Sequence, residues 1–136
     1  MVVVDANVAL AWVLEEQGTS AARALFEGAA TLWAPEFLVV ECGAVLATKH
    51  RRNELTAVEA RAYLTAIAEA PIGWLPDYPL ALEAQPLALR IGHSAYDCLY
   101  LAAAIVHGGS LATLDARFVQ AASAAGYGDH LRLLGA

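Results

Sequence analysis

Short apolar runs alternate with longer amphipathic stretches along the chain, which is the pattern of strands and helices in turn. The run Val2 to Val4 is β-branched and unalternating, as in a strand that is buried on both faces. Similar runs predict strands at Thr31 to Ala34, Gly73 to Leu75, Leu111 to Leu114 and Leu131 to Leu134. Because helical patterns separate these runs, we expect an α/β fold with three layers (α/β/α) and a mainly parallel sheet of four to five strands.

The intervals between these runs have the spacing and the capping residues of helices. In chain order, helices are predicted from Val8 to Leu14, from Thr19, from Phe37 to about Arg52, from Thr56, from Leu80 to Ile91, from Ser94 to about Val106 and from Arg117 to Ala125. Pro35 suits the first position of the third helix. Pro86 should break the fifth helix or start a second one there, because proline removes a backbone donor.

A chain of 136 residues that is 59% hydrophobic predicts one folded domain, over residues 1–136. Cys42 and Cys98 lie inside apolar runs, as buried thiols do in a reducing environment. The sequence after Met1 leaves no room for a signal peptide, and the longest apolar stretch, Cys98 to Val106, is too short to span a membrane. We therefore expect a cytoplasmic protein with no membrane association.

Acidic residues outnumber basic ones by 14 to 8, so the net charge is −6. This balance argues against broad, non-specific DNA binding by this chain alone. It leaves a nucleic-acid substrate open, because a bound divalent cation can hold phosphate where the protein's own charge would repel it.

Four carboxylates stand where the predicted fold would bring them together. Asp5 follows the first strand, Asp115 follows the fourth, Asp97 lies in the first turn of a helix, and Glu41 lies within an apolar helix. Ligands of parallel α/β sheets bind at the edge where strands end and helices begin. Each of the three aspartates could instead cap a helix, and Glu41 could pair with an arginine such as Arg51 or Arg117.

Carboxylates that converge need a counter-charge, since two of them about 4 Å apart repel by about 4 kcal/mol at an effective dielectric of about 20. A divalent cation resolves this conflict. Because the candidate ligands are all oxygen atoms, Mg²⁺ or Mn²⁺ fits better than zinc. Such a site favours hydrolysis of phosphodiester bonds, with one ion or two.

The segments that hold these acids also carry a family resemblance. They are Val2 to Val8 with Ala11-Trp12, Pro35 to Glu41, Ser94 to Ala102, and Leu111 to Phe118. Together they resemble a PIN domain, and more narrowly the VapC toxins of bacterial type II toxin–antitoxin modules. Cys98 departs from the alanine that is common at this position in such proteins, and the predicted break at Pro86 fits the family loosely.

The resemblance implies a metal-dependent endoribonuclease that cuts RNA and is inhibited by a cognate VapB-like antitoxin. By this likeness Asp5 and Asp97 are the principal metal-binding acids, and Glu41 and Asp115 complete the acidic pocket. Accompanying polar positions, which would hold water or a carboxylate, are Asn7 and Thr113.

Other side chains have two interpretations each. Arg117 could contact substrate phosphate or pair with an acid. The basic stretches His50 to Arg52 and Arg90 to His93 could flank an RNA groove or be solvated. The helix from Thr56 to Glu69 and the tryptophans could contact an antitoxin or a second copy in a homodimer, or belong to the core.

Other function classes fit less well. A receiver-type phosphoacceptor domain needs a lysine near its last strand, whereas the sole lysine here is Lys49. A dehalogenase-type phosphatase needs a second aspartate where Asn7 stands. Three alternatives stay open: an antitoxin-controlled toxin, a solitary PIN nuclease, and a PIN-like module that binds a partner with little catalytic activity.

Overall fold

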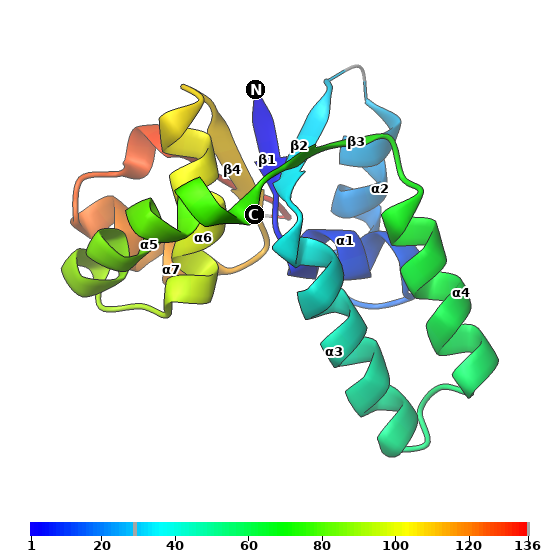
Figure 1. Cartoon of the computed structure of the whole chain (residues 1–136). Helices are drawn as coiled ribbons and strands as arrows, with labels where there is room; N and C mark the ends of the chain where they lie inside the picture. Colours follow the sequence, from blue (N-terminus) through cyan, green and yellow to red (C-terminus); the bar gives the residue numbers. More distant parts are fainter. Residues whose placement is uncertain (29, 136) are drawn as a thin grey trace.

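A five-stranded parallel sheet forms the centre of the molecule in the computed structural model, which describes residues 1–28 and 30–135 (Figure 1). The strands lie in the order β3-β2-β1-β4-β5. Their bounds are β1 Val2–Val4, β2 Leu32–Pro35, β3 Ile72–Leu75, β4 Ser110–Thr113 and β5 Leu131–Leu133. The predicted fold class is confirmed. Ala29, within the second helical pattern, and Ala136, the last residue of the predicted domain, lie outside the described residues.

Helices cover both faces of the sheet, as right-handed crossovers between parallel strands require. Their bounds are α1 Ala6–Val13, α2 Thr19–Glu27, α3 Phe37–Arg51, α4 Ala57–Ala68, α5 Asp77–Ile91, α6 Ala95–Val106 and α7 Ala116–Ala124, with a short 3₁₀ turn at Gly128–His130. Figure 1 shows α1 to α4 on one side and α5 to α7 on the other, with α3 and α4 extending downwards as a hairpin.

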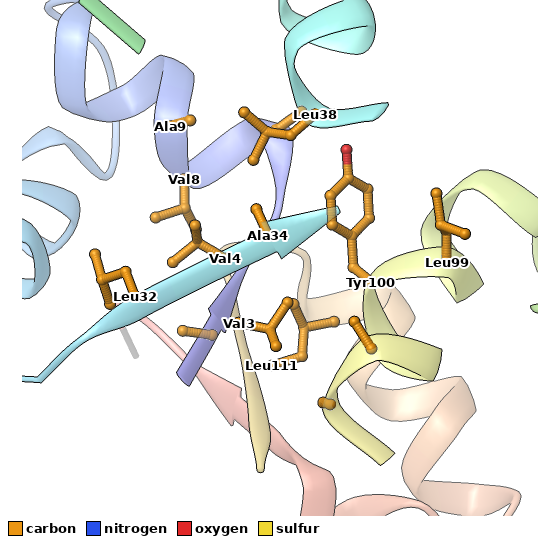
Figure 2. Close-up of a cluster of buried hydrophobic side chains, with 14 of the residues drawn as sticks. Val3, Val4, Val8, Ala9, Leu32, Ala34, Leu38, Leu99, Tyr100 and Leu111 are labelled. Atoms are coloured by element: carbon orange, nitrogen blue, oxygen red, sulfur yellow. The ribbon is translucent and has the colours of Figure 1, made fainter. Parts of the chain in front are cut away.

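The central strand β1 organises the core. Val3 and Val4 are fully buried, and Val3 pairs in register with Leu111 of β4 and with Trp33 of β2 (Figure 2). From β1 the chain adds β2 and then β3 on one side of it, and afterwards adds β4 and then β5 on the other side. The order of the strands therefore reverses between β1 and β4. The crevice at such a switch point is where open α/β sheets bind their ligands.

Both prolines of interest differ from the predictions. Pro35 is the last residue of β2, paired with Leu75, and α3 begins only at Phe37. The prediction of a break at Pro86 is wrong, because α5 continues through it. Proline leaves the carbonyl of Leu82 without its helical donor, but Leu82 is exposed, so water can replace that donor. Packing of buried α5 residues then keeps the helix continuous.

The tryptophans belong to the core rather than to an open surface. All three, Trp12, Trp33 and Trp74, are partly buried against the core, and Trp12 stacks on Phe26 with ring centroids 4.4 Å apart. Both cysteines are buried and free, as predicted. Across residues 1–28 and 30–135, every helix is too short or too polar to cross a bilayer.

We expect Gly73→Ala to destabilise the fold. A Cβ atom at Gly73 would lie 2.3 Å from Cε3 of Trp33, which packs across it from β2. The indole would have to move out of its core contacts, at a cost on the order of 1–3 kcal/mol in the free energy of unfolding. Urea denaturation followed by circular dichroism measures the change.

The control for this test is Gly43→Ala in the middle of α3. A Cβ there would meet Leu64 at an ordinary 3.5 Å. Because alanine favours helix more than glycine does, this variant should keep or raise stability by up to about 1 kcal/mol. Equal stability of the two variants would contradict the close approach of Trp33.

Candidate active site

The carboxyl edge of the sheet carries the acids singled out in the sequence. Asp5 directly follows β1 and is the N-cap of α1, and Asp115 is the N-cap of α7, two residues beyond β4. Glu41 lies in the second turn of α3, and Asp97 lies in the first turn of α6. The charges of Glu41 and Asp97 act on Asp5, whereas the Asp115 carboxylate is recorded only as the cap of α7.

Asp5 is held through both of its carboxylate oxygens. Oδ1 accepts a hydrogen bond from the backbone N–H of Val8 at 3.0 Å, and Oδ2 accepts one from the Thr113 hydroxyl at 2.5 Å. Burial raises the pKa of Asp5 to about 6, and the charges of Glu41 and Asp97 add to this rise. The hydrogen bonds act in the opposite direction, so loss of solvent outweighs them.

Glu41 is held by a buried phenol rather than by an arginine. The Tyr100 hydroxyl donates to Glu41 Oε1 at 3.1 Å, and Figure 2 shows this hydroxyl directed out of the core towards α3. Burial raises the pKa of Glu41, and the charge of Asp97 raises it further. Burial together with the charge of Glu41 also raises the pKa of Tyr100, so the phenol keeps its proton and remains the donor.

The cap of α6 is supplied by Ser94 and not by the Asp97 carboxylate. The Ser94 hydroxyl accepts from the Asp97 backbone N–H at 3.2 Å, which caps α6. The Asp97 carboxylate, 43% exposed, lies 3.7 Å from Nδ1 of His93, whose ring packs edge-on against Phe118. Asp97 is therefore the most accessible of the acids whose charges act on Asp5.

Asp115 is linked to Asp5 through Thr113. Its backbone N–H donates to the Thr113 hydroxyl at 3.1 Å, while its own Oδ1 caps α7 by accepting from Phe118 N–H at 3.0 Å. Thr113 is fully buried, so its hydroxyl ties the end of β4 to the end of β1. The capping interpretation holds for both Asp5 and Asp115, since Oδ1 of each accepts from a backbone N–H of the helix that follows. Oδ2 of Asp5 also accepts from Thr113.

The remaining candidates lie at the surface. Asn7 is exposed on α1, and Arg117 is exposed in the first turn of α7. No ion pair joins Arg117, Arg51 or any other base to Glu41 in the part of the chain that the structure describes. The alternative in which Glu41 pairs with an arginine does not hold among the described residues, and Glu41 accepts from Tyr100 instead.

The oxygen ligands at this edge of the sheet are the type that hard divalent cations prefer. Within residues 1–28 and 30–135, no group of three or more Asp, Glu, His or Cys side chains is arranged to hold a metal ion. Mg²⁺ seldom uses a complete cage of protein ligands, since it keeps several waters and binds through one or two carboxylates plus substrate phosphate. Among the described residues no ion pair reaches Asp5 or Glu41. Burial raises the pKa of both carboxyls, and the nearby charge of Asp97 raises both further.

Two residues that shape the site were not singled out in the sequence. Tyr100 lies one helical turn beyond Asp97 within an apolar run, and a buried tyrosine usually finds a partner for its hydroxyl. Asp77, expected in a solvated turn, begins α5, and its carboxylate accepts from the Phe37 backbone N–H at 2.9 Å. That bond caps α3 from 40 residues away, a pairing with no local sequence signal.

Comparison with known families decides the family of this fold. The family model for the PIN domain matches residues 2–124. The chain belongs to the PIN domain family. PIN domains are nucleases, and they generally use divalent metal ions. No curated protein is similar enough in sequence to match this PIN domain.

Solved structures with the same fold come from several organisms. PAE2754 of Pyrobaculum aerophilum superposes with a TM-score of 0.71 at 22% identity, over 88% of this chain and 78% of that one. VapC20 of Mycobacterium tuberculosis, a sarcin–ricin loop cleaving toxin, gives 0.67 at 17% identity, over 93% and 95%. FitAcB of Neisseria gonorrhoeae gives 0.62 at 17% identity, over 90% and 94%. At these identities the likeness shows a shared fold.

We expect Asp5→Asn to stabilise the metal-free protein at neutral pH. Since the pKa of Asp5 is raised from 3.8 to about 6, the folded state binds the proton more tightly than the unfolded state. Stability from this group is full below pH 4 and is lost as the pH rises through 6. The variant should gain on the order of 2 kcal/mol at pH 7 and nothing at pH 3.5.

Urea denaturation in EDTA at several pH values tests this expectation. Asp129→Asn, at an exposed aspartate in the 3₁₀ turn, is the control for the change in net charge. A constant difference between Asp5→Asn and wild type from pH 3.5 to 7 would contradict the burial argument.

Proposed function

We propose that this PIN domain is a metal-dependent endoribonuclease and the toxin of a VapBC-type toxin–antitoxin system. One observation carries the proposal. Asp5, Glu41 and Asp97 lie near enough to one another for their charges to interact, and no basic side chain among the described residues forms an ion pair with Asp5 or Glu41. A site that lacks positive charge and offers oxygen ligands suits Mg²⁺ or Mn²⁺ together with a phosphodiester.

Each acid has a part in this mechanism. Asp5 and Asp97 would hold the metal ion, and Glu41 and Asp115 would complete the acidic pocket. The ion, when bound, supplies charge neutralisation for the phosphate and lowers the pKa of a bound water. The buried Thr113 hydroxyl donates a hydrogen bond to the Asp5 carboxylate and so fixes its orientation before a substrate binds.

Glu41 is the group best suited to take the proton of the attacking water. Its raised pKa makes it a stronger base than an ordinary glutamate, and Tyr100 occupies only Oε1. Oε2 is left to accept the proton. Tyr100 acts as a positioning residue because it contacts Glu41 and not the reacting atoms.

RNA as substrate and an antitoxin as partner rest on the family resemblance together with the fold. VapC20 is a toxin that cleaves the sarcin–ricin loop, and a toxin–antitoxin complex from Klebsiella pneumoniae shares this fold with a TM-score of 0.59 at 16% identity, over 85% of this chain and 87% of that one. An arginine from an antitoxin could replace the cation in the acidic pocket and block it.

A homodimer is supported by one apolar face. Phe37 and Tyr96 stack with centroids 5.4 Å apart beside a groove of about 220 Å³ between α3, α5 and α6. Tyr96, which lines this groove, is 65% exposed, and Tyr78 and Leu82 are further exposed apolar side chains of α5. Large exposed aromatic and aliphatic groups favour contact with another protein surface, which we assign to a second copy of this chain.

We expect Asp97→Asn to abolish cleavage while the fold stays intact. Removing one charged ligand should lower the cleavage rate of a labelled RNA by about 100-fold or more and weaken Mg²⁺ binding measured by calorimetry. Chelation should stop the wild-type enzyme, and Mn²⁺ or Mg²⁺ should restore it. Asp129→Asn is the matched control. Full activity of Asp97→Asn, or of wild type in excess EDTA, would overturn the proposal.

We also expect Tyr100→Phe to slow cleavage without unfolding the protein. The lost hydrogen bond should cost about 1 kcal/mol of stability, and the misplaced Glu41 should lower the rate about 10-fold to 100-fold. Tyr63→Phe, at a half-buried tyrosine of α4, serves as control. If Tyr100 acts through Glu41, adding Tyr100→Phe to Glu41→Gln should change the rate no further. Additive losses would contradict this assignment.

A further inference from the structure

One stripe of α3 leads from the acidic site to the far end of the α3–α4 hairpin. Glu41, Val45, Thr48 and Arg52 follow one another at intervals of four, three and four residues, so they share one face of the helix. The 11 residue steps from Glu41 to Arg52 span about 16 Å at 1.5 Å per step. This face is therefore far longer than a single phosphodiester.

A groove follows this stripe. It has a volume of about 350 Å³ and is lined by Ala44, Val45, Thr48, Lys49, Arg52 and Glu54. Its lining starts one helical turn beyond Glu41 and ends at Glu54, past the end of α3. Small or aliphatic residues line the end near Glu41, and the far end carries Lys49 and Arg52 beside Glu54.

Positive charge is concentrated at that far end. Three of the eight Lys and Arg residues of this acidic chain, Lys49, Arg51 and Arg52, fall within four positions. Lys49 lies 3.7 Å from Glu54, and the Arg51 guanidinium donates to the Thr48 hydroxyl at 2.9 Å. Arg52 is exposed and has no ion pair among residues 1–28 and 30–135. The helix dipole favours a cation at any exposed position of the last turn of α3. It does not specify that Arg52 lines the groove on the same face of the helix as Glu41.

We propose that the groove along α3 binds the RNA strand outside the cleaved bond, with Arg52 and Lys49 contacting its phosphates. This inference rests on the proposed function, because it takes RNA as the substrate of the acidic site. An extended polyanion is the ligand that needs both ends of the groove, a phosphate at the acids and further phosphates at the cations. A protein segment fits less well, since the lining offers no aromatic anchor or deep apolar pocket.

Neutralising Arg52 tests the groove. Arg52→Gln should raise KM for an RNA of about 12 nucleotides roughly 3-fold to 10-fold at unchanged kcat, and should lower the salt dependence of binding in EDTA by about one unit of slope. For a trinucleotide too short to reach from the cleaved bond to Arg52, both constants should stay unchanged. Arg52→Lys should retain most of the affinity because it keeps the charge.

Arg132→Gln is the matched control, since Arg132 is exposed on β5 at the opposite edge of the sheet from β3. If Arg52→Gln matches Arg132→Gln on the long RNA, or loses as much on the trinucleotide, the groove proposal is overturned while the nuclease assignment stands. Loss of binding to a protein partner with RNA binding intact would also overturn it. If the wild type cleaves no RNA, the proposed function fails, and binding of the same RNA in EDTA still decides the groove.

Discussion

Burial of neighbouring carboxylates at the end of an apolar sheet is the constraint on which this molecule depends. Asp5, Glu41 and Asp97 come from three separate elements, and the charges of the latter two act on the first. Hydrogen bonds from Val8, Thr113 and Tyr100 reduce the cost of this arrangement but do not remove it. The fold thus keeps an uncompensated negative charge in a place where a cation and a phosphate can relieve it.

The apolar centre of the sheet holds this arrangement in place. β1 is short and buried, and it lies between β2 and β4. Its end is therefore fixed, and so is the position of Asp5, the next residue. Thr113 fixes the end of β4 beside it, and Tyr100 reaches out of the core to α3. Rigid elements rather than loops therefore carry most of the site, which suits a reaction that needs its groups in place before the substrate binds.

Local patterns were enough to predict the strands, the alternation with helices and the edge at which the acids gather, because buried strands and caps have short-range signals. Pro86 misled the prediction, since the local rule for proline ignores the packing that holds α5 together and the water that can reach Leu82. The partners of the acids could not be predicted for a different reason. The bonds from Tyr100 to Glu41 and from Asp77 to Phe37 join residues 59 and 40 positions apart, and only the folded topology brings them together.

The bond from Asp77 to the Phe37 amide has a consequence beyond local geometry. It joins the first residue of α5 to the start of the helix that carries Glu41, and it adds to the bonds from Tyr100 to Glu41 and from Thr113 to Asp5 that connect the two sides of the sheet. A mutational survey of this PIN domain would class Asp77 with the four acids, although its carboxylate accepts a hydrogen bond from a backbone amide. In such a survey, intolerance to substitution would identify residues that hold the helices together as well as residues of the candidate site.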